Sequence, residues 1–432
     1  MILVDNALKA REAAGNPIKV GIIGAGAMAK GMINQIAKYT PGMVVAATHA
    51  RTIEKATTSY DYAGITGYKI TNSVSEAEAT IAKGKSVITD NIDVLIEAGN
   101  IDILVEATGA VEFTARLFLK AMDFGKHILS FNAEIDATLG PILKQKADQA
   151  GVMYSVADGD QPGVTLNLYR FVKSMGFTPL VAGNIKGLQD RYRNPTTQAS
   201  FAKQWQMAPE MVTSFADGTK ISIEQACIAN ATGMKVAQRG MIGHHSKEHI
   251  DDLTKLFDVD QLKELGGIVD YVVGPKPGPG VFIYATTDDP LSAHYLKYGK
   301  LGDGPLYSFY VPYHLLLFEI PNSISRMVDF KDTILAPIGA PVVEVMTAAK
   351  TDLKAGETLD GLGGYKYYGM CENSPVMRAE NLLPVGLANG VKLKNDIPKD
   401  QAITLDDIIM PEDSLVFDLF HQQLEAFQTQ AV

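Results

Sequence analysis

The chain has 432 residues, of which 46% are hydrophobic and 20% charged, and its formal net charge is -10 at pH 7. A chain of this length is expected to form two or three domains, each with its own apolar core. The acidic balance and the lack of long Lys or Arg runs argue against nucleic acid or an anionic membrane as a partner, and no apolar run reaches the roughly 18 residues of a membrane span.

The first third of the chain alternates strand-like and helix-like segments, after a leading helix expected over residues 1–15. The strand-like runs are "IKVGIIGAG", "MVVAAT", "IDILVEAT", "HILSF" and "VMYSVA", and between them lie the helix-like "AKGMINQIAKY", "FTARLFLKAMDFG" and "ATLGPILKQKADQAG". Runs that are apolar throughout are typical of strands buried on both faces of a parallel sheet. Residues 1–157 are therefore predicted to form an α/β domain with the doubly wound parallel sheet of the Rossmann type.

The pattern changes after residue 157. Residues 158–335 mix loops with helices such as "TKISIEQACIANATGM" and β-rich pieces such as "GIVDYVV" and "VFIYATT", which predicts an α+β domain for substrate binding and oligomerisation. Between the last two pieces, "GPKPGPG" (Gly274–Gly280) reads either as a rigid turn or as a loop that closes over a ligand. Residues 336–432 contain two similar units, Asp352–Gly356 and Asp396–Asp400, and are predicted to form a small β-rich module.

A glycine-rich turn follows the first strand-like run. Its spacing is Gly24, Gly26 and Ala29, with Ala27 and Met28 at the expected start of the next helix. A GxGxxA match is weak by itself, but here a buried strand precedes it and a helix pattern follows it, as a dinucleotide site requires. The first glycine permits the tight turn, the second lets a pyrophosphate approach, and the free N–H groups of the helix start bind the phosphates. A purely structural turn is the alternative.

The end of the second strand predicts which dinucleotide binds. NAD sites usually carry an Asp or Glu there for the ribose 2′-hydroxyl, whereas NADP sites carry Arg and small hydroxyl residues. No carboxylate occurs from Ala27 to Ile53; instead the strand ends in His49, Arg51 and Thr52. Because a guanidinium pairs with a 2′-phosphate through two hydrogen bonds, NADP(H) is the predicted cofactor, with an ordinary solvated Arg51 as the alternative.

The next two strands end in further candidates. The run "VEATGAVEF" puts Ala107, Thr108 and Gly109 at the strand end that faces the cofactor crevice, so they are expected near the nicotinamide ribose. The run "HILSFNAEID" delivers Asn132 and Glu134 to the same edge, where they are candidates for nicotinamide or substrate contacts. Glu134 reads equally well as a cap of the following helix.

Hydride transfer to a carbonyl needs a group that handles the proton of the oxygen. The sequence offers no zinc ligand set for this task, so Lys186 and Lys220 are the candidates, each with a solvated surface lysine as the alternative. Lys220 and Glu224 are four residues apart and share one helix face, either as a simple ion pair or as an acid with its orienting partner.

Charged residues of the same domain are candidates for anion and metal binding. Asp158 and Asp160 follow a strand and suit a divalent metal or substrate hydroxyls, unless they only form a turn beside Gly159. Phosphate recognition favours forked guanidinium donors. The candidates for a substrate phosphate are Arg191, Arg193 and Arg239.

Several of these stretches resemble a known family. "VGIIGAGAMA", "EATG" and "GKHILSFNAE" are similar to the nucleotide domain of homoserine dehydrogenases. Together with "ADGDQPG", "FADGTKISIEQACIANATGM", "RGM" and "DLKAGETLDGLGGYKYYG", nearly the whole chain resembles the homoserine-dehydrogenase-like oxidoreductases with a C-terminal SAF domain. This resemblance implies NAD(P) dependence and a SAF-like fold for residues 336–432. The group includes 1-deoxy-D-xylulose 5-phosphate reductoisomerase-like enzymes of isoprenoid precursor synthesis and sugar-acid oxidoisomerases.

One departure bears on the substrate. Homoserine dehydrogenases typically have an Asn-Lys pair after the strand that corresponds to "HILSF", whereas this chain reads Asn132-Ala133-Glu134. An anion at the position of a cation disfavours homoserine. The expected function is an NADPH-dependent oxidoreductase that acts on a phosphorylated or acidic polyol, with reductoisomerase-like activity as the leading expectation. If the reaction includes a skeletal rearrangement, a divalent cation, Mg²⁺ or Mn²⁺, is expected as well, with Asp158, Asp160 and Glu134 as candidate ligands.

Three other functions stay open: a branched sugar-acid oxidoisomerase, another sugar or semialdehyde dehydrogenase, and a non-catalytic NADP-binding metabolite sensor. The two cysteines, Cys227 and Cys371, lie far apart, with no further Cys or His at ligand spacing, so neither a disulfide framework nor a zinc site is indicated. A cytoplasmic setting, a small-molecule substrate and, by analogy, a homo-oligomer are expected.

Overall fold

The protein is described by a computed structural model over residues 2–428. Its contacts divide the chain into two compact units. Unit 1 comprises the chain up to Asp136, Ile142–Gly163 and Leu315–Ala336, and unit 2 comprises Ala137–Pro141, Val164–His314 and the chain from Pro337 on. The division falls within two helices, α7 (Ala133–Gln149) and α8 (Gln161–Ser174). The two boundaries predicted between the three domains, after residues 157 and 335, stay predictions.

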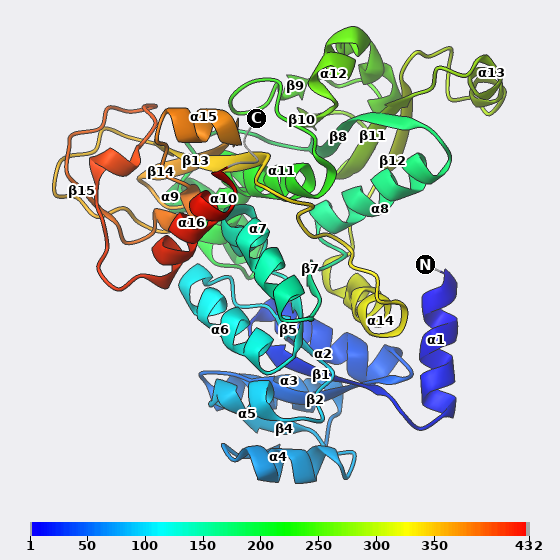
Figure 1. The fold of residues 1–432 in the computed structure, drawn as a ribbon, viewed down its shortest axis with the longest axis vertical. Coiled ribbons are helices and arrows are strands. Elements are labelled where there is room, and N and C mark those ends of the chain that lie inside the picture. Colours follow the sequence, from blue (N-terminus) through cyan, green and yellow to red (C-terminus); the bar gives the residue numbers. More distant parts are fainter. Residues whose placement is uncertain (1, 429–432) are drawn as a thin grey trace. The chain divides into compact units, whose positions relative to one another are not determined.

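Unit 1 is built around a seven-stranded sheet in the order β3-β4-β2-β1-β5-β6-β7, and every neighbouring pair is parallel (Figure 1). The predicted α/β fold with a parallel doubly wound sheet is confirmed. The strand order reverses on the two sides of β1, which opens a crevice at the carboxyl ends of β1, β2 and β5. The strands are β1 (Ile18–Ile23), β2 (Met43–His49), β3 (Lys69–Ile70), β4 (Val87–Thr89), β5 (Ile103–Glu106), β6 (His127–Ser130) and β7 (Tyr154–Val156).

Capping side chains and a glycine define the ends of several helices of unit 1. Ser73 and Asn91 accept backbone hydrogen bonds at the starts of α4 and α5, and Gly64 ends α3 in the left-handed region. The leading helix expected from sequence is α1 (Ile2–Ala13). The others are α2 (Ala27–Tyr39), α3 (Ile53–Ala63), α4 (Val74–Ile81), α5 (Ile92–Glu97), α6 (Val111–Asp123), the 3-10 helix η2 (Leu316–Glu319) and α14 (Ile320–Phe330).

The segment Leu315–Ala336 joins unit 1, although it is distant from it in sequence. The N–H of Val156 in β7 donates to the carbonyl of Leu335 at 2.8 Å, so the segment covers the free edge of the sheet. Arg11 of α1 donates to Asp329 of α14 at 2.6 Å, which ties the leading helix to the same segment. The sequence pattern did not predict this docking because no local periodicity records a contact over some 180 residues.

Unit 2 contains a mixed five-stranded sheet in the order β12-β11-β8-β10-β9. The strands are β8 (Thr178–Lys186), β9 (His244–His245), β10 (Ile268–Val273), β11 (Gly280–Thr286) and β12 (Tyr307–Val311). Its core includes Val181, Ile268 and Phe282. The helices are α9 (Pro195–Trp205), α10 (Pro209–Asp217), α11 (Thr219–Thr232), η1 (Ile250–Leu256), α12 (Val259–Leu265) and α13 (Pro290–Tyr298). Helix α11 is buried along most of its length and packs on β8 and β10.

The C-terminal part of unit 2 is rich in short β elements, as predicted. Strands β13 (Val343–Ala349) and β14 (Tyr367–Asn373) pair antiparallel and pack on α11. The remaining elements are α15 (Ser374–Ala379), η3 (Val385–Leu387), β15 (Lys392–Leu393), η4 (Leu405–Asp407), β16 (Ile408–Ile409) and α16 (Leu415–Ala426). Among residues 2–428, none of the helices has the length and apolarity that a bilayer crossing requires.

The two similar units noted in the sequence pair with each other. Leu353 and Ile397 exchange two backbone hydrogen bonds of 2.9 Å. Lys354 Nζ lies 2.8 Å from the Asp396 carboxylate, and the N–H of Lys399 donates to Asp352 at 2.9 Å. Asp352 of the first unit and Asp396 of the second each contact the other unit, so these two aspartates have the same structural role.

Candidate functional site

A pocket of about 360 Å³ opens at the reversal point of the unit 1 sheet. Its floor is the glycine-rich turn between β1 and α2, where Gly24 has φ +119° and the N–H of Gly24 donates to His49 at the end of β2. A Cβ at Gly24 would lie 3.1 Å from the carbonyl oxygen of Ala107, whereas a Cβ at Gly26 would meet nothing within 4 Å. Gly24 is thus needed for the turn, and Gly26 faces the open pocket.

Helix α2 begins directly behind this turn. Gly26 is its N-cap and has no side chain to satisfy the first N–H groups, which are therefore available to a ligand. Ala29 is fully buried against the sheet, as the GxGxxA pattern predicts. Ala27 and Met28, predicted as cofactor contacts, do not line the pocket, but Ala25 does. The geometry is that of a phosphate site at a helix N-terminus.

The wall of the pocket that follows β2 is cationic. His49, Ala50, Arg51, Thr52 and Lys55 line it, and no Asp or Glu does. Arg51 and Lys55 are exposed, so their charges meet a ligand in the pocket rather than the protein interior. His49 is 6% exposed and stacks on Phe113 with ring centroids 6.2 Å apart. Burial lowers the pKa of His49, so its ring is neutral at physiological pH.

The opposite wall follows β5 and holds a buried carboxyl group that the sequence reasoning missed. Ala107, Thr108, Ala110 and Phe113 line the pocket, while Gly109 does not. Below them lies Glu106, which is fully buried and accepts hydrogen bonds from both the N–H and the hydroxyl of Thr108. Burial raises the pKa of Glu106, against the effect of the Thr108 bonds. The sequence signal that could have identified Glu106 is an acidic residue at the end of an otherwise apolar strand.

Asn132 and Glu134 lie at the start of α7. Asn132 is the N-cap: its Oδ1 accepts from the N–H of Ile135 at 3.2 Å and its Nδ2 donates to Thr114 at 3.4 Å. Its side chain is 1% exposed, so its polar atoms serve hydrogen bonds within the protein. The capping role that we considered for Glu134 thus belongs to Asn132. Glu134 lies in the first turn of α7, and its charge contributes to the raised pKa of Glu106.

The predicted catalytic residues of unit 2 lie on two elements that pack together, α11 and the end of β8. Helix α11 packs on β8, and Asn184 Nδ2 donates to Glu224 Oε2 at 3.1 Å while Asn184 Oδ1 accepts from Gln225 at 3.1 Å. Lys220 lies one turn before Glu224 on α11, and both are buried, with exposures of 9% and 4%. Lys186 at the end of β8 donates to the carbonyl of Phe215 at 3.0 Å. Asn184 and Gln225 are polar partners that the sequence reasoning did not identify.

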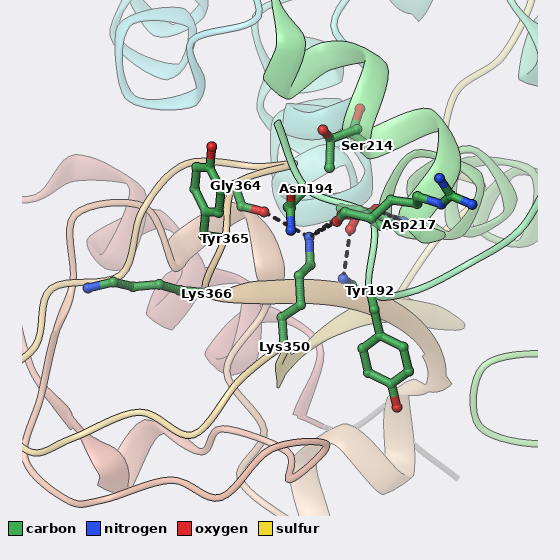
Figure 2. Close-up of polar contacts among 12 residues, drawn as sticks. Tyr192, Asn194, Ser214, Asp217, Lys350, Gly364, Tyr365 and Lys366 are labelled. Atoms are coloured by element: carbon green, nitrogen blue, oxygen red, sulfur yellow. Dashed lines mark hydrogen bonds and ion pairs between the residues drawn. The ribbon is translucent and has the colours of Figure 1, made fainter. Parts of the chain in front are cut away.

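A buried ion pair fixes the start of α11 (Figure 2). Lys350 Nζ donates to Asp217 Oδ2 at 2.9 Å and to the carbonyls of Arg193 and Gly364 at 2.8 Å each. The other Asp217 oxygen accepts from the N–H of Thr219, the first residue of α11. Burial raises the pKa of Asp217, and Lys350 opposes that effect. This pair, which could not be predicted from the sequence, holds the turn that precedes Lys220.

The predicted metal ligands do not form a metal site. Asp158 is 2% exposed; it accepts from the N–H of Gly159 at 2.9 Å and lies 3.9 Å from Arg326. Asp160 accepts from the N–H of Gln161 at 3.0 Å. Within residues 2–428, no group of three or more His, Cys, Asp or Glu side chains is arranged to hold a metal ion. The turn-forming interpretation of Asp158 and Asp160 fits these contacts.

The arginines predicted for phosphate binding have protein partners. Arg239 donates through Nε to Glu372 and through Nη2 to Glu380, both at 2.7 Å. Arg193 pairs with Asp190 at 3.0 Å. The guanidinium of Arg191 lies over the ring of Tyr368 and donates to its hydroxyl at 3.4 Å. Arg239 has both atoms of its binding edge engaged, so its predicted role is not supported, whereas Arg191 is exposed and has no carboxylate partner among the described residues.

Comparison with known proteins gives two family matches on adjacent parts of the chain. Residues 24–157 match the model "Homoserine dehydrogenase, NAD binding domain", and residues 159–320 match "Oxidoreductase DRL, catalytic domain". A curated homoserine dehydrogenase from Mycobacterium leprae is 35% identical over 66 residues, which is 15% of this chain. The chain spans only 15% of the length of that relative.

Two solved structures have related shapes at low sequence identity. A probable dehydrogenase from Thermotoga maritima has a TM-score of 0.43 and 11% identity, over 74% of this chain and 91% of its own. KijD10, a 3-ketoreductase from Actinomadura kijaniata in complex with NADP and TDP-benzene, has a TM-score of 0.38 and 13% identity, over the same shares. By the two family matches, residues 24–157 are similar to the NAD-binding domain of homoserine dehydrogenases and residues 159–320 to an oxidoreductase catalytic domain.

Proposed function

We propose that the preferred coenzyme is NADP(H). The observation that carries this proposal is the wall after β2, which offers Arg51, Lys55 and the Thr52 hydroxyl to a ligand and contains no carboxylate. A ribose 2′-phosphate brings two negative charges to this wall and is bound by a guanidinium through paired hydrogen bonds. NAD lacks that phosphate and gains nothing from these side chains.

We propose that the substrate is a phosphorylated or acidic polyol, with a reductoisomerase-like activity on 1-deoxy-D-xylulose 5-phosphate as the leading candidate. The support is the resemblance of nearly the whole sequence to that group and the replacement of the Asn-Lys pair by Asn132-Ala133-Glu134. The described carboxylates do not form a metal site, so no step is assigned to a metal ion. Two alternative activities remain within the same reaction class: a branched sugar-acid oxidoisomerase and another sugar or semialdehyde dehydrogenase.

The proposed chemistry is reduction of a carbonyl group. The coenzyme, when bound, supplies a hydride to the carbonyl carbon. We assign to Lys220 the donation of a proton to the carbonyl oxygen, and to Glu224, four residues on along α11, the orientation of that ammonium. Lys186 is the second candidate for the proton. Burial of Lys220 favours this role because a buried ammonium is held in place and shielded from bulk water.

The coenzyme proposal is tested by titrating the purified protein with NADPH and NADH. Replacing Arg51 by Ala should weaken NADPH binding by about tenfold, or ~1.4 kcal/mol, and leave NADH binding nearly unchanged. The matched control is Arg116→Ala on α6, whose side chain is 58% exposed and pairs with Glu112. Equal losses for both coenzymes in Arg51→Ala would contradict the assignment.

The substrate proposal is tested by turnover. Ketose phosphates, branched sugar acids and semialdehydes are offered with NADPH, with and without Mg²⁺ or Mn²⁺, and Lys220→Ala is compared with the wild type. Loss of turnover with unchanged NADPH affinity supports the catalytic role of Lys220, and unchanged turnover removes it. NADPH binding without consumption on every compound would instead favour a non-catalytic metabolite sensor.

A further inference from the structure

A small cavity in the C-terminal part of unit 2 is lined by residues of β13, α15 and α16 and of the loops beside them. Its volume is about 100 Å³. Glu344 from β13, Arg378 from α15 and the amide of Asn381 are its polar lining, and the rest is apolar: Met377, Leu382, Leu405, Phe420 and Leu424. Neither the two family matches nor the proposed reaction gives this cavity a role, since the matched regions end at residue 320.

The polar part of the cavity is one edge of a guanidinium. Arg378 Nε and Nη2 are both buried, and neither has a hydrogen-bond partner within residues 2–428. These two nitrogens point their N–H groups in parallel along one edge of the plane, which is the edge that binds a carboxylate through two hydrogen bonds. Leaving such donors buried without a partner is costly, and buried polar groups are almost always hydrogen-bonded, so their location indicates a ligand.

The same edge is occupied in other arginines of this protein. Arg326 donates through Nε and Nη2 to Asp332 at 2.9 and 2.7 Å, and Arg239 uses the same two atoms for Glu372 and Glu380. Arg11 and Arg193 each direct Nε at an Asp. In this chain a buried or half-buried guanidinium edge is therefore ordinarily matched by carboxylate oxygens, and Arg378 is the exception.

Glu344 does not supply the missing carboxylate. Its Oε2 accepts from the hydroxyl of Ser374, and no ion pair joins it to Arg378 among the described residues. Glu344 is 3% exposed, and burial raises its pKa while the charge of Arg378 opposes that rise. A carboxyl group in this state is able to share a proton with a second carboxylate, so it does not exclude an acid from the cavity.

We propose that this cavity binds a small aliphatic carboxylate, with the carboxylate on the Nε and Nη2 edge of Arg378 and the hydrocarbon chain against the apolar wall. The volume limits the size: a cavity of about 150 Å³ holds benzene, which has six heavy atoms, so 100 Å³ suits an acid of about two or three carbons. An inorganic anion matches the guanidinium but leaves the wall formed by Phe420 and Leu424 uncovered, so it is the weaker occupant.

The test uses the full chain without coenzyme, so its outcome is independent of the proposed reaction. Propionate, the matching amide propionamide, and inorganic phosphate are titrated by calorimetry and by thermal unfolding. Propionate should bind saturably, with a dissociation constant in the micromolar to millimolar range, and raise the Tm, because it binds the folded state only. Propionamide and phosphate should bind at least about tenfold more weakly, because each lacks one of the two matched parts.

Arg378→Gln should reduce propionate binding by at least about tenfold, whereas Arg116→Gln should leave it unchanged. If Arg378→Gln does not fold, the comparison of propionate with propionamide and phosphate on the wild type decides. The absence of saturable propionate binding to the wild type overturns the proposal, as does equal binding of propionate to Arg378→Gln. Phosphate binding as tight as propionate binding would also overturn it, since the apolar wall would then play no part.

Discussion

The coenzyme pocket of unit 1 and the polar centre around α11 of unit 2 are built in different ways. The pocket takes its phosphate-binding groups from the main chain of Gly24–Gly26 and the first turn of α2, which are neighbours in sequence. The centre around α11 takes its order from side chains that meet across long separations: Asn184 and Glu224 are 40 residues apart, and Asp217 and Lys350 are 133 apart. A site made of local backbone tolerates many side-chain changes, whereas a site made of distant side chains depends on each of them.

The largest expected effect is a loss of stability on disrupting the side-chain centre around α11. Replacing Lys350 by Met leaves the Asp217 carboxylate buried without its cation, and the free energy of unfolding should fall by about 3–5 kcal/mol. Urea denaturation measures the loss. The control is Lys354→Met, because Lys354 and Asp396 form an exposed pair, with side-chain exposures of 69% and 59%, and exposed pairs contribute about 0–1 kcal/mol. Equal and small losses in both variants would contradict the dependence of unit 2 on this pair.

A second prediction sharpens the comparison through pH. Asp270 on β10 is fully buried, and burial raises its pKa from 3.8 to about 7, although the N–H groups of Gly243 and Tyr271 donate to its Oδ1. The folded state therefore keeps a proton that the unfolded chain releases between these two pH values. The stability contributed by Asp270 is full below pH 3.8 and is lost as the pH rises to about 7, a change on the order of 4 kcal/mol at most.

Replacing Asp270 by Asn should remove this dependence, because the amide stays neutral and still accepts the two backbone hydrogen bonds. Unfolding by urea between about pH 4 and about pH 8 should show the stability of Asp270→Asn rising relative to the wild type as the pH increases. Asp303→Asn serves as the control, since that carboxylate is 79% exposed. Parallel pH profiles for wild type and Asp270→Asn would show that Asp270 has the same pKa in the folded and unfolded states, which would contradict the prediction.

The smallest expected effect concerns the backbone-built pocket. Gly24→Ala puts a Cβ 3.1 Å from the Ala107 carbonyl at φ +119°, and this strain should cost about 1–2 kcal/mol and weaken coenzyme binding by about tenfold. Gly64 is the matched control: it also has a positive φ, +77°, but a Cβ there meets nothing within 4 Å and it does not line the pocket. Gly64→Ala should lower stability but leave coenzyme affinity unchanged, as measured by fluorescence titration. A coenzyme affinity of Gly24→Ala equal to that of Gly64→Ala would contradict this.

The same contrast explains what the sequence predicted. The GxGxxA turn, the alternation of strands and helices in unit 1 and the absence of a carboxylate after β2 can each be read from neighbouring residues, and short-range patterns record such relations. The helix face shared by Lys220 and Glu224 was predictable for the same reason. Asn184 as the partner of Glu224, and Lys350 as the partner of Asp217, were not, because nothing local in either stretch specifies the other.

Two single residues illustrate the limit in the pocket itself. Glu106 carried a local signal, a lone acidic residue in an apolar strand, but its bonds to Thr108 depend on how the chain turns after β5. Phe113 carried no signal, since an aromatic residue early in a helix is ordinary core material until the fold stacks it on His49. Arg239 shows the reverse case, where a plausible phosphate ligand proved to be committed to Glu372 and Glu380.

The docking of Leu335 on β7 bears on any attempt to isolate the nucleotide-binding fold. A fragment that stops at residue 157 lacks the strand partner of Val156 and presents unpaired amide and carbonyl groups on the last strand of its sheet. Such a fragment is expected to aggregate, whereas the same fragment fused through a short linker to residues 315–336 regains its cover and should remain monodisperse.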